Sequence, residues 1–393
     1  MTHPHIMIVA GEASGDMHGA RLVRELEKRA PDASFCGMGG KELAAAGVEI
    51  LCDAAKIAVV GILEVVSHLK DIRKAMRTLE NRLKDHSPHL LILIDYPDFN
   101  LMLAKKAKSL GIPVLYYISP QVWAWRSGRV KKIRRLVDRM AVILPFEQQF
   151  YQERGMTAEF VGHPLMDSVR TSMTREQFLS RNNIEEGKTI IGLLPGSRKK
   201  EIASMLPVFL KAAALFCHEQ EKDEYVFLLP LARTLSIKDL ENNGLAETKL
   251  DVRVIDVDRY DMMAACDATM ATSGTVTLEL AILGVPMVVA YRIAPITYFL
   301  GRRLIKVPYV SLVNLVADRK IVPELLQDNA TPENICSALT DLVLTTESRK
   351  LMRRELASVC EQLGGPGASS RVAQLALEIV RQGPLGESPR KGL

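Results

Sequence analysis

Short apolar runs alternate with longer amphipathic stretches along nearly the whole chain. In the first half, the apolar runs that we expect to form strands cover residues 6–10, 34–37, 90–94, 114–118, 139–144 and 158–162. In the second half, they cover residues 189–194, 225–229, 252–255, 268–271 and 287–291. Strands that alternate with helices form parallel sheets covered by helices, so the pattern predicts an α/β fold.

The alternation lapses near residues 164–188, a polar stretch that we interpret as a domain junction. We therefore predict two doubly wound, Rossmann-like domains, over residues 1–165 and 189–365, joined by a linker over 166–188. Helical periodicity dominates the last third, at residues 332–344, 347–363 and 368–381. We expect a C-terminal helix over 366–382, and a disordered tail over 383–393 because this segment is rich in Gly, Pro and charge.

Composition narrows the function classes. The 393 residues are 48% hydrophobic and 25% charged, which is typical of a soluble globular protein. A net charge of +5 is too weak to indicate nucleic acid as a partner. The six cysteines are scattered without a CxxC pair, which favours a reducing compartment over a disulfide framework or a metal cluster. We expect neither a signal peptide nor a spanning helix, because the apolar runs are short.

The first candidate site follows the first predicted strand. Gly11, Glu12, Ser14, Gly15 and Asp16 lie in a turn that opens a helix. Glycines allow a ligand close to the backbone, and amides at a helix start attract anions. The spacing is not GxGxxG, which weighs against a dinucleotide oxidoreductase. A tight turn with Asp16 as a helix cap explains the pattern equally well.

The second candidate site follows the strand at 189–194. Gly196 and Ser197 precede three consecutive cations, Arg198, Lys199 and Lys200, at the start of a helix. Cations oppose the helix macrodipole there, so their presence indicates that an anion binds. We predict a diphosphate site, with Arg198 as the bidentate ligand. A solvated charge run is the alternative.

A third turn joins the strand at 268–271 to a helix. Ser273, Gly274 and Thr275 supply small side chains and amides, a second place for an anion. Glu279 follows one helical turn later in an otherwise apolar helix, where an unpartnered carboxylate is costly to bury. We predict that Glu279 accepts hydrogen bonds from a ribose diol. An ordinary cap and helix Glu is the competing interpretation.

Carboxylates also follow the apolar strand at 90–94. The segment Asp-Tyr-Pro-Asp-Phe-Asn at residues 95–100 places Asp95 and Asp98 where doubly wound folds carry out chemistry. One of them is a candidate general base. A proline turn with Asp98 as a helix cap is the alternative. Glu12, Asp16 and Asp95 compete with Asp98 for the role of base.

Aromatic and apolar segments point to sugars or lipids. Trp123 and Trp125 suit a sugar or a lipid interface, although core packing explains such residues more often. Two stretches suit a membrane surface. Residues 57–66 are almost entirely apolar, and residues 292–306 combine apolar with basic side chains. The residues we expect to touch this surface are Val59, Val60, Ile62, Leu63, Phe299, Arg302 and Arg303. A core helix with a basic flank is the alternative.

Taken in order, these motifs resemble those of the lipid-A-disaccharide synthase family. The resemblance covers nearly the whole chain, to about residue 381. The most specific motif is Ser-Pro-Gln-Val-Trp-Ala-Trp at residues 119–125, joined by the turns at 11–16, 95–100, 193–198 and 273–279 and by 309–315. Asn314 matches a position that the family places near the donor. Its neighbour Val313 departs from the family pattern, which has a proline at this position of the local turn.

The resemblance implies an inverting GT-B glycosyltransferase that needs neither metal nor cofactor. Such enzymes join UDP-2,3-diacylglucosamine to 2,3-diacylglucosamine 1-phosphate, giving a β-1,6-linked disaccharide phosphate and UDP for lipid A of Gram-negative bacteria. They act at the cytoplasmic face of the inner membrane, as peripheral proteins. By this resemblance, Asp98 takes the proton of the acceptor hydroxyl and the turn at 11–16 faces the acceptor. Arg198 stabilises the leaving diphosphate, with Gly196, Ser197 and the turn at 273–275 beside it.

Other functions remain open to test. A UDP-N-acetylglucosamine 2-epimerase shares the GT-B fold but needs no lipid contacts. A non-catalytic UDP-sugar-binding or lipid-binding protein would tolerate replacement of Asp98. The sequence leaves the oligomeric state open, a homo-oligomer included.

Overall fold

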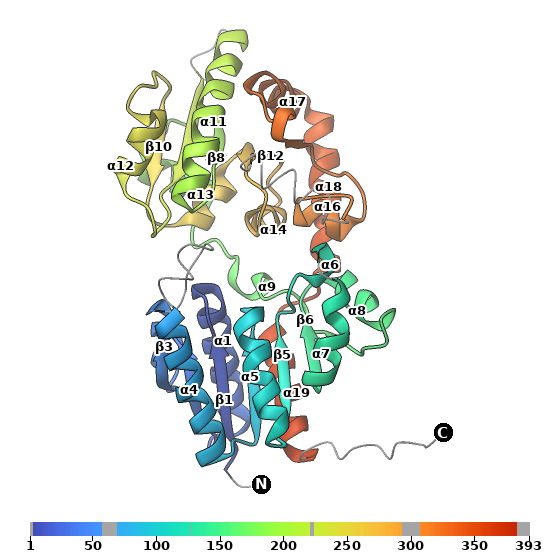
Figure 1. The fold of residues 1–393 in the computed structure, drawn as a ribbon. Coiled ribbons are helices and arrows are strands. Elements are labelled where there is room, and N and C mark those ends of the chain that lie inside the picture. Colours follow the sequence, from blue (N-terminus) through green and yellow to red (C-terminus); the bar gives the residue numbers. More distant parts are fainter. Residues whose placement is uncertain (1–2, 57–68, 126, 221–223, 293–306, 383–393) are drawn as a thin grey trace. The chain divides into compact units, whose positions relative to one another are not determined.

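The structure is a computed structural model that describes residues 3–56, 69–125, 127–220, 224–292 and 307–382. The chain divides into two compact α/β units (Figure 1). The first comprises residues 1–164 and 364–393, and the second comprises residues 165–363. The chain therefore leaves the first unit once and returns to it for its last helix.

Seven parallel strands form the sheet of the first unit, in the order β3-β2-β1-β4-β5-β6-β7. They are β1 (His5–Ala10), β2 (Ser34–Gly39), β3 (Glu49–Asp53), β4 (Leu90–Ile94), β5 (Val114–Tyr117), β6 (Arg139–Val142) and β7 (Glu159–Phe160). The order reverses between β1 and β4, whose last residues Ala10 and Ile94 are paired. Doubly wound sheets bind ligands beyond the carboxyl ends of the strands at such a reversal.

Helices cover both faces of this sheet (Figure 1). They are α1 (Ala13–Arg29), α2 (Lys41–Ala45), α4 (Leu69–His86), α5 (Pro97–Ser109), α6 (Val122–Trp125), α7 (Val130–Leu136), α8 (Pro145–Gln152) and α19 (Ala368–Gln382), with 3₁₀ turns η1 (Ala54–Lys56) and η2 (Ser127–Arg129). Met7 and Val9 of β1 pack with α4, α5 and α7, whereas Ile6 and Ile8 pack with α1 and α19. Because β1 is buried on both faces, its sequence is continuously apolar.

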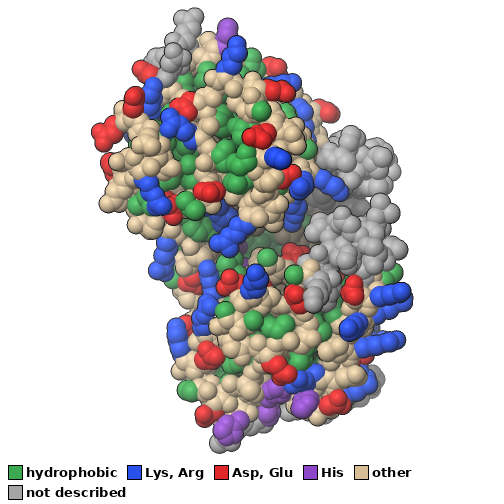
Figure 2. Space-filling model, turned by 90° about the vertical axis from the view of Figure 1, so that its left-hand side faces the viewer, with side chains coloured by type: hydrophobic (Ala, Val, Ile, Leu, Met, Phe, Trp, Pro, Cys, Tyr) green, Lys and Arg blue, Asp and Glu red, His purple; other side chains and the backbone are tan. Residues whose placement is uncertain are grey.

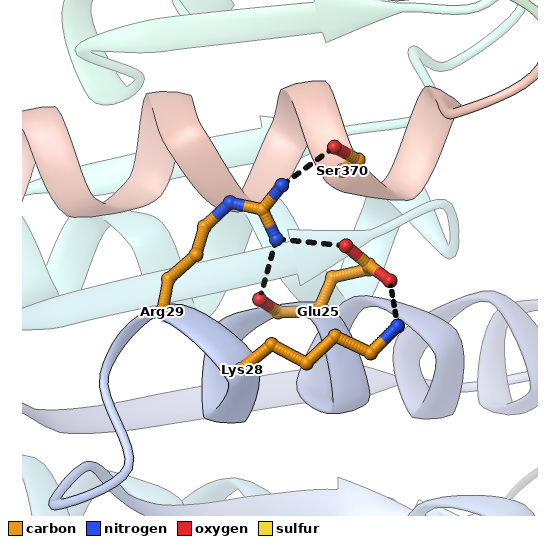
Figure 3. A network of polar contacts seen from close by, with 4 residues as sticks. All are labelled: Glu25, Lys28, Arg29 and Ser370. Atoms are coloured by element: carbon orange, nitrogen blue, oxygen red, sulfur yellow. Dashed lines mark hydrogen bonds and ion pairs between the residues drawn. The ribbon is translucent and has the colours of Figure 1, made fainter.

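The C-terminal helix α19 is part of the core of the first unit. Its apolar face lies in the same cluster as α1. At the edge of this contact, Arg29 on α1 donates to the Ser370 hydroxyl on α19 at 2.7 Å and to the Glu25 carboxylate at 2.7 Å (Figure 3). Lys28 also pairs with Glu25. The last helix thus completes the first unit even though more than 190 residues of the second unit separate it from residue 164.

The second unit has a six-stranded parallel sheet in the order β10-β9-β8-β11-β12-β13. The strands are β8 (Thr189–Leu194), β9 (Tyr225–Pro230), β10 (Val252–Ile255), β11 (Ala268–Ala271), β12 (Met287–Tyr291) and β13 (Glu324–Leu326). This sheet reverses between β8 and β11, whose last residues Leu194 and Ala271 are paired. Each unit therefore has one reversal, and each reversal is flanked by two of the turns singled out in the sequence.

The helices of the second unit are α9 (Leu165–Ser168), α10 (Arg175–Arg181), α11 (Lys199–Gln220), α12 (Ile237–Leu240), α13 (Arg259–Ala265), α14 (Val276–Ile282), α16 (Leu312–Ala317), α17 (Pro332–Leu344) and α18 (Thr346–Gln362). A π-turn η3 (Glu241–Leu245) and a 3₁₀ turn η4 (Gln327–Asn329) complete it. Among the described residues, only α11 is long and apolar enough to cross a membrane, and half of its apolar window is buried. It packs against α17, as a core helix does.

The expected α/β class with two parallel sheets is confirmed, and every strand expected from the apolar runs is present. Two short edge strands, β3 and β13, were not predicted from the sequence. Residues 166–188, which we expected to be a linker, belong to the second unit. Ser172 and Met173 there donate their backbone amides to the buried carboxylate of Asp261, at 2.7 and 3.0 Å. These contacts explain why a polar stretch is part of a folded unit.

Candidate active site

Gly11 at the end of β1 and Tyr96 at the end of β4 lie in direct contact across the first reversal. A Cβ atom on Gly11 would lie 2.3 Å from the Tyr96 ring, a distance that no side chain tolerates. Tyr96 has a left-handed backbone (φ 47°) and immediately precedes α5. The glycine therefore allows the aromatic ring to cover the turn, and the ring connects this turn to the start of α5.

The turn after β4 is strained and held by buried hydrogen bonds. Asp95 and Tyr96 both adopt left-handed backbone conformations, which cost non-glycine residues about 1–3 kcal/mol each. The buried Asn100 side chain donates to the Asp95 carbonyl at 2.7 Å, and the Tyr116 hydroxyl donates to the same oxygen. Burial, and then the nearby Glu12 charge, raise the pKa of Asp95 to about 6. A carboxyl group that titrates near neutral pH is a candidate functional group.

Asp98 lies in the first turn of α5 with its side chain 75% exposed. Its carboxylate forms an ion pair with Arg129 at 2.8 Å, which orients it without burying it. A carboxylate in a first turn also complements the helix macrodipole. Geometry therefore leaves Asp98 accessible to a substrate hydroxyl.

Asp16 caps a helix, although not the helix that it belongs to. Its buried carboxylate accepts hydrogen bonds from the backbone amides of Gly40, Glu42 and Leu43 at 2.7–3.2 Å, at the start of α2. These bonds give the Asp16 carboxylate a structural role at the start of α2, and its expected acceptor-side role stays a prediction.

The other expected residues of this turn divide into two kinds. Gly15 is buried, and a Cβ there would lie 3.3 Å from Ala10 and 3.6 Å from Ile94. It therefore lets α1 pack closely on β1 and β4. Glu12 and Ser14 are exposed at the start of α1. These two side chains are accessible to a ligand.

The two tryptophans have different environments. Trp123 donates its indole N–H to the Glu147 carboxylate at 3.1 Å and packs edge-on against Phe146 at 5.0 Å between ring centroids. Trp125 is 47% exposed. Burial raises the pKa of Glu147 to about 7, although the amides of Leu144 and Ile143 and the Trp123 indole all donate to its charged form. Sequence analysis did not identify Glu147, because a glutamate in a first helical turn is ordinary.

In the second unit, a carboxylate occupies the turn after β8. Glu201 accepts hydrogen bonds from the backbone amides of Ser197 and Arg198, at 2.9 and 3.2 Å, and from the Arg198 guanidinium at 3.3 Å. Gly196 is left-handed (φ 111°), and a Cβ there would lie 2.3 Å from the Glu201 carboxylate. The turn therefore already binds an oxyanion, which is supplied by its own helix.

The cations beside this turn have different ion-pair partners. Lys199 pairs with Asp239 at 2.9 Å, and Thr234 donates to the Ser197 carbonyl at 2.6 Å, so the turn is held from the side of α12. Arg198 is 64% exposed. The Arg198 guanidinium and the amides of the turn bind the same Glu201 carboxylate, whereas the Lys199 ammonium is paired with Asp239.

The turn after β11 lies at the second strand of the same reversal, next to the turn after β8. Ser273 donates its hydroxyl to the Val310 carbonyl at 2.9 Å. Thr275 begins α14 and its side chain makes no capping bond to that helix. Gly274 has no atom within 4 Å of a Cβ built on it. The turn therefore has open space beside Gly274 and the hydroxyl of Thr275 at the helix start.

Glu279 is buried and already has partners. Its carboxylate accepts from the Arg259 guanidinium at 2.7 Å and from the Tyr260 hydroxyl at 3.2 Å. Burial raises the pKa of Glu279, and the Arg259 charge opposes that rise. Arg259 itself is half exposed and lies over the Tyr260 ring. Sequence analysis did not identify Arg259 or Tyr260, which begin a different helix from Glu279.

Asn314 is buried inside the second unit. Its amide donates to the Val322 carbonyl and to Glu324, and its oxygen accepts from the backbone amides of Ile321 and Val322, all at 2.8–3.0 Å. These four bonds use its full capacity. The structure thus gives Asn314 a role in holding the segment before β13, and none of these bonds tests the donor contact that we expected.

The expected membrane-contact residues, Val59, Val60, Ile62, Leu63, Phe299, Arg302 and Arg303, lie outside the described residues. Within the described residues, no three His, Cys, Asp or Glu side chains form a group that could hold a metal ion. On the face shown in Figure 2, charged side chains of both signs are interspersed with small apolar areas.

Comparison with known proteins gives consistent matches over the whole length. A sequence model described as lipid-A-disaccharide synthetase matches residues 6–379. The lipid-A-disaccharide synthase of Geobacter metallireducens is 49% identical over 378 residues, which cover 95% of this chain and 97% of that protein. The lipid-A-disaccharide synthase of Nitrosococcus oceani is 47% identical over 385 residues, which cover 98% of each.

Solved structures share the fold at low sequence identity. MurG of Acinetobacter baumannii aligns with a TM-score of 0.58 at 17% identity, covering 95% of this chain and 99% of its own. A UDP-GlcNAc 2-epimerase of Neisseria meningitidis bound to UDP-GlcNAc aligns with a TM-score of 0.64 at 13% identity, covering 96% and 100%. These likenesses confirm the predicted GT-B architecture and carry no information about the reaction.

Proposed function

Because the chain belongs to the lipid-A-disaccharide synthase family, we propose that it joins UDP-2,3-diacylglucosamine to 2,3-diacylglucosamine 1-phosphate. The products are the β-1,6-linked disaccharide 1-phosphate and UDP. The chain is a glycosyltransferase of GT-B fold. The choice of these two lipids, and the residues that act on them, are the proposal.

One observation carries the donor half of the proposal. The amides of Ser197 and Arg198 and the Arg198 guanidinium already converge on one carboxylate, Glu201. The same donors suit a diphosphate, since amides at a helix start and a guanidinium both bind phosphate oxygens. In this proposal the donor diphosphate displaces Glu201. Thr275 and the amides of its turn, on the neighbouring strand end, bind the same group.

The ribose end of the donor is assigned to Glu279. Its carboxylate is buried, yet Arg259, one of its partners, is half exposed. A ribose diol can donate to the carboxylate when the Arg259 side chain turns outward. Before the nucleotide binds, Arg259 and Tyr260 hold the Glu279 carboxylate in position, and the Tyr260 hydroxyl can stay bound to it when Arg259 leaves.

The chemical step needs an acceptor hydroxyl, a base and a stabilised leaving group. We assign the base to Asp98, because its carboxylate is accessible and is oriented by Arg129. The acceptor oxygen forms a bond to C1 of the donor sugar while the bond from C1 to the diphosphate oxygen breaks. The hydroxyl proton passes to Asp98, and the negative charge that grows on UDP is stabilised by Arg198.

Membrane attachment is also part of the proposal. Both proposed substrates carry acyl chains, so the enzyme must reach lipids that reside in a bilayer. We assign this contact to the cytoplasmic face of the inner membrane, through the apolar and basic segments at 57–66 and 292–306. A mildly basic chain, with a pI near 8.8, suits an anionic surface.

A detergent-micelle assay tests the proposal. Purified protein receives each lipid alone and both together, without added metal, and the disaccharide and UDP are measured. We expect both products only when both lipids are present. UDP release or epimerised sugar without the acceptor would instead favour a 2-epimerase, and folded protein that yields no product would contradict the transferase assignment.

The Arg198→Ala variant tests the donor site in the same assay. We expect weaker UDP binding and a lower rate, because a guanidinium–phosphate contact is lost. Lys238→Ala, an exposed cation in the same unit, is the matched control. Unchanged UDP affinity in Arg198→Ala would remove the turn at 196–198 from the donor site.

A further inference from the structure

A cavity of about 260 Å³ lies within the first unit, at the carboxyl ends of β4, β5 and β6. Asp95, Ser119, Gln121, Trp125 and Glu147 line it, together with apolar side chains. Pockets for drug-sized ligands measure roughly 300–1,000 Å³. The cavity is therefore large enough for one small ring and too small for an acylated sugar as a whole.

The chemistry of the lining favours a neutral polar ring. Asp95 and Glu147 are carboxyl groups, and no Lys or Arg is among the described lining residues. A phosphate would be repelled by the Asp95 carboxylate. Hydroxyl groups, in contrast, donate hydrogen bonds to a carboxylate and to the Gln121 amide oxygen. The half-exposed ring of Trp125 offers an apolar face on which the C–H face of a sugar can lie.

The backbone around the cavity is held in an unusual conformation. Asp95 (φ 46°) and Ile118 (φ 64°) both line the cavity and both adopt the left-handed region. A β-branched residue such as Ile118 is rarely found there. Its amide is held by the Ala141 carbonyl at 3.1 Å, and the Asp95 carbonyl accepts from Asn100. Strain of this kind is concentrated at ligand sites, which is a second and independent indication of binding.

We propose that this cavity binds the sugar ring of the acceptor, with Asp95 accepting a hydrogen bond from a ring hydroxyl and Trp125 stacking on the ring. The inference rests on the proposed function, because the acceptor is its ligand. Pro97 lines the cavity and immediately precedes Asp98. A ring held here lies beside the base without enclosing it. Asp95 is thus a binding residue for the acceptor, separate from the residue that takes the proton.

Glu147 acts on this cavity as a positioning residue. Its carboxylate binds the Trp123 indole at 3.1 Å and the backbone amides of Ile143 and Leu144 at 3.2 and 3.0 Å. These bonds tie the short helix that carries both tryptophans to the start of α8. The Glu147 carboxylate on α8 therefore fixes the position of α6, and with it the cavity wall that Trp125 forms.

The Asp95→Asn variant tests the proposal in steady-state kinetics with both lipids in micelles. We expect the KM for the acceptor to rise about 10- to 100-fold, while the donor KM and the UDP Kd stay within about twofold. Asp32→Asn, an exposed aspartate in a turn of the same unit, is the matched control. Trp125→Ala is the second variant, because its exposed side chain can be removed without opening the core.

The pH profile gives a readout that a structural role would not move. In the wild type, kcat/KM for the acceptor should fall below about pH 6, as Asp95 takes up a proton. The other titratable groups that face it are Glu12, Tyr116 and Glu147, with Asp98 in the first turn of α5, which follows it. These groups are present in both the wild type and Asp95→Asn. In the pH profile of Asp95→Asn, only the fall in kcat/KM that is caused by protonation of Asp95 should therefore disappear.

Three results would overturn the inference. An unchanged acceptor KM in folded Asp95→Asn is the first. A loss of kcat at constant KM is the second, since it would place Asp95 in the chemistry. If Asp95→Asn does not fold, an unchanged acceptor KM in Trp125→Ala is the third.

Failure of the proposed function has a different signature. If the wild type makes no disaccharide, saturation-transfer NMR with N-acetylglucosamine at tens of millimolar probes the cavity directly. A signal that is lost in Trp125→Ala would support a sugar site in a protein of another function. No signal in the wild type would overturn the cavity assignment as well.

Discussion

The Glu201 carboxylate accepts hydrogen bonds from both the backbone amide and the guanidinium of Arg198, at 3.2 and 3.3 Å. A glutamate at the third helical position that reaches back to the helix start is a common cap. Here it also fills the place where the proposed donor diphosphate binds. The same carboxylate therefore stabilises α11 and competes with the ligand.

Glu201→Gln separates these two effects. Glutamine serves as well as glutamate in this cap, so the helix start should persist while the negative charge is lost. We expect UDP to bind about three- to tenfold more tightly, which corresponds to about 0.7–1.4 kcal/mol. Calorimetric titration with UDP measures this, and Glu241→Gln, an exposed residue of the same unit, is the control. Weaker UDP binding would show that Glu201 supports the site and does not compete with the ligand.

Replacement of Asp98 tests the proposed base. Asp98→Ala should lower kcat by about 10²–10⁴-fold, because general-base catalysis contributes that much. UDP binding should change little, since Asp98 belongs to the other unit. Asp85→Ala, an exposed aspartate on α4, controls for loss of a surface charge. Near-normal turnover would exclude Asp98 as the base and return that role to the other carboxylates near the turn.

Gly11→Ala tests the contact between the first two turns. The new methyl group would overlap the Tyr96 ring, which must move, and the start of α5 would move with it. We expect kcat to fall at least tenfold, and the free energy of unfolding to fall by about 1–3 kcal/mol. Gly365→Ala is the matched control, because a Cβ there has no neighbour within 4 Å. Full activity in Gly11→Ala would show that the contact between Gly11 and Tyr96 does not set the position of α5.

The buried Glu147 predicts a pH dependence of stability. Its pKa is about 7 in the folded protein and about 4.3 in an unfolded chain. Between these values the folded state keeps a proton that the unfolded state has released. The contribution of this group to stability is therefore complete below about pH 4 and is lost as the pH rises through about 7.

Glu147→Gln should flatten that dependence. We expect the melting temperature of the wild type to fall more steeply between pH 5 and pH 8 than that of the variant. Glu153→Gln, an exposed residue at the end of the same helix, should keep the wild-type slope. Equal slopes in Glu147→Gln and the wild type would contradict a protonated Glu147 in the folded state.

Replacement of Asn314 should lower the stability of the protein and leave its affinity for the donor unchanged. Asn314→Ala leaves two buried backbone amides and one carbonyl without their partner. We expect the free energy of unfolding to fall by about 2–4 kcal/mol, because unpaired buried groups are costly. Asn334→Ala, an exposed asparagine of the same unit, is the control. Normal stability with weakened UDP binding would restore Asn314 to the donor site.

The fold class could be predicted from the sequence because buried parallel strands are continuously apolar and short. All the strands expected from apolar runs are present, and β4, β8, β10, β11 and β12 match residue for residue. The edge strands β3 and β13 escaped this pattern. Glu49 and Asp53 bound the first, and Glu324 begins the second, because an edge strand is covered less completely and tolerates charge.

By itself, the sequence determined which turns follow strands, and therefore which residues lie at the carboxyl ends of the two sheets. Local pattern is enough for that, since a strand, a glycine turn and a helix start are all short-range features. Only the tertiary structure decided which of these residues still have a free side chain. The Asp16 carboxylate is used by amides of α2, which lie 24 to 27 residues away in the sequence. Asn314 is used by amides 7 and 8 residues further on, and Glu201 occupies its own anion site, while Asp98 stays exposed. Hydrogen-bond partners and burial depend on elements that meet only in the folded chain, so no local pattern reports them.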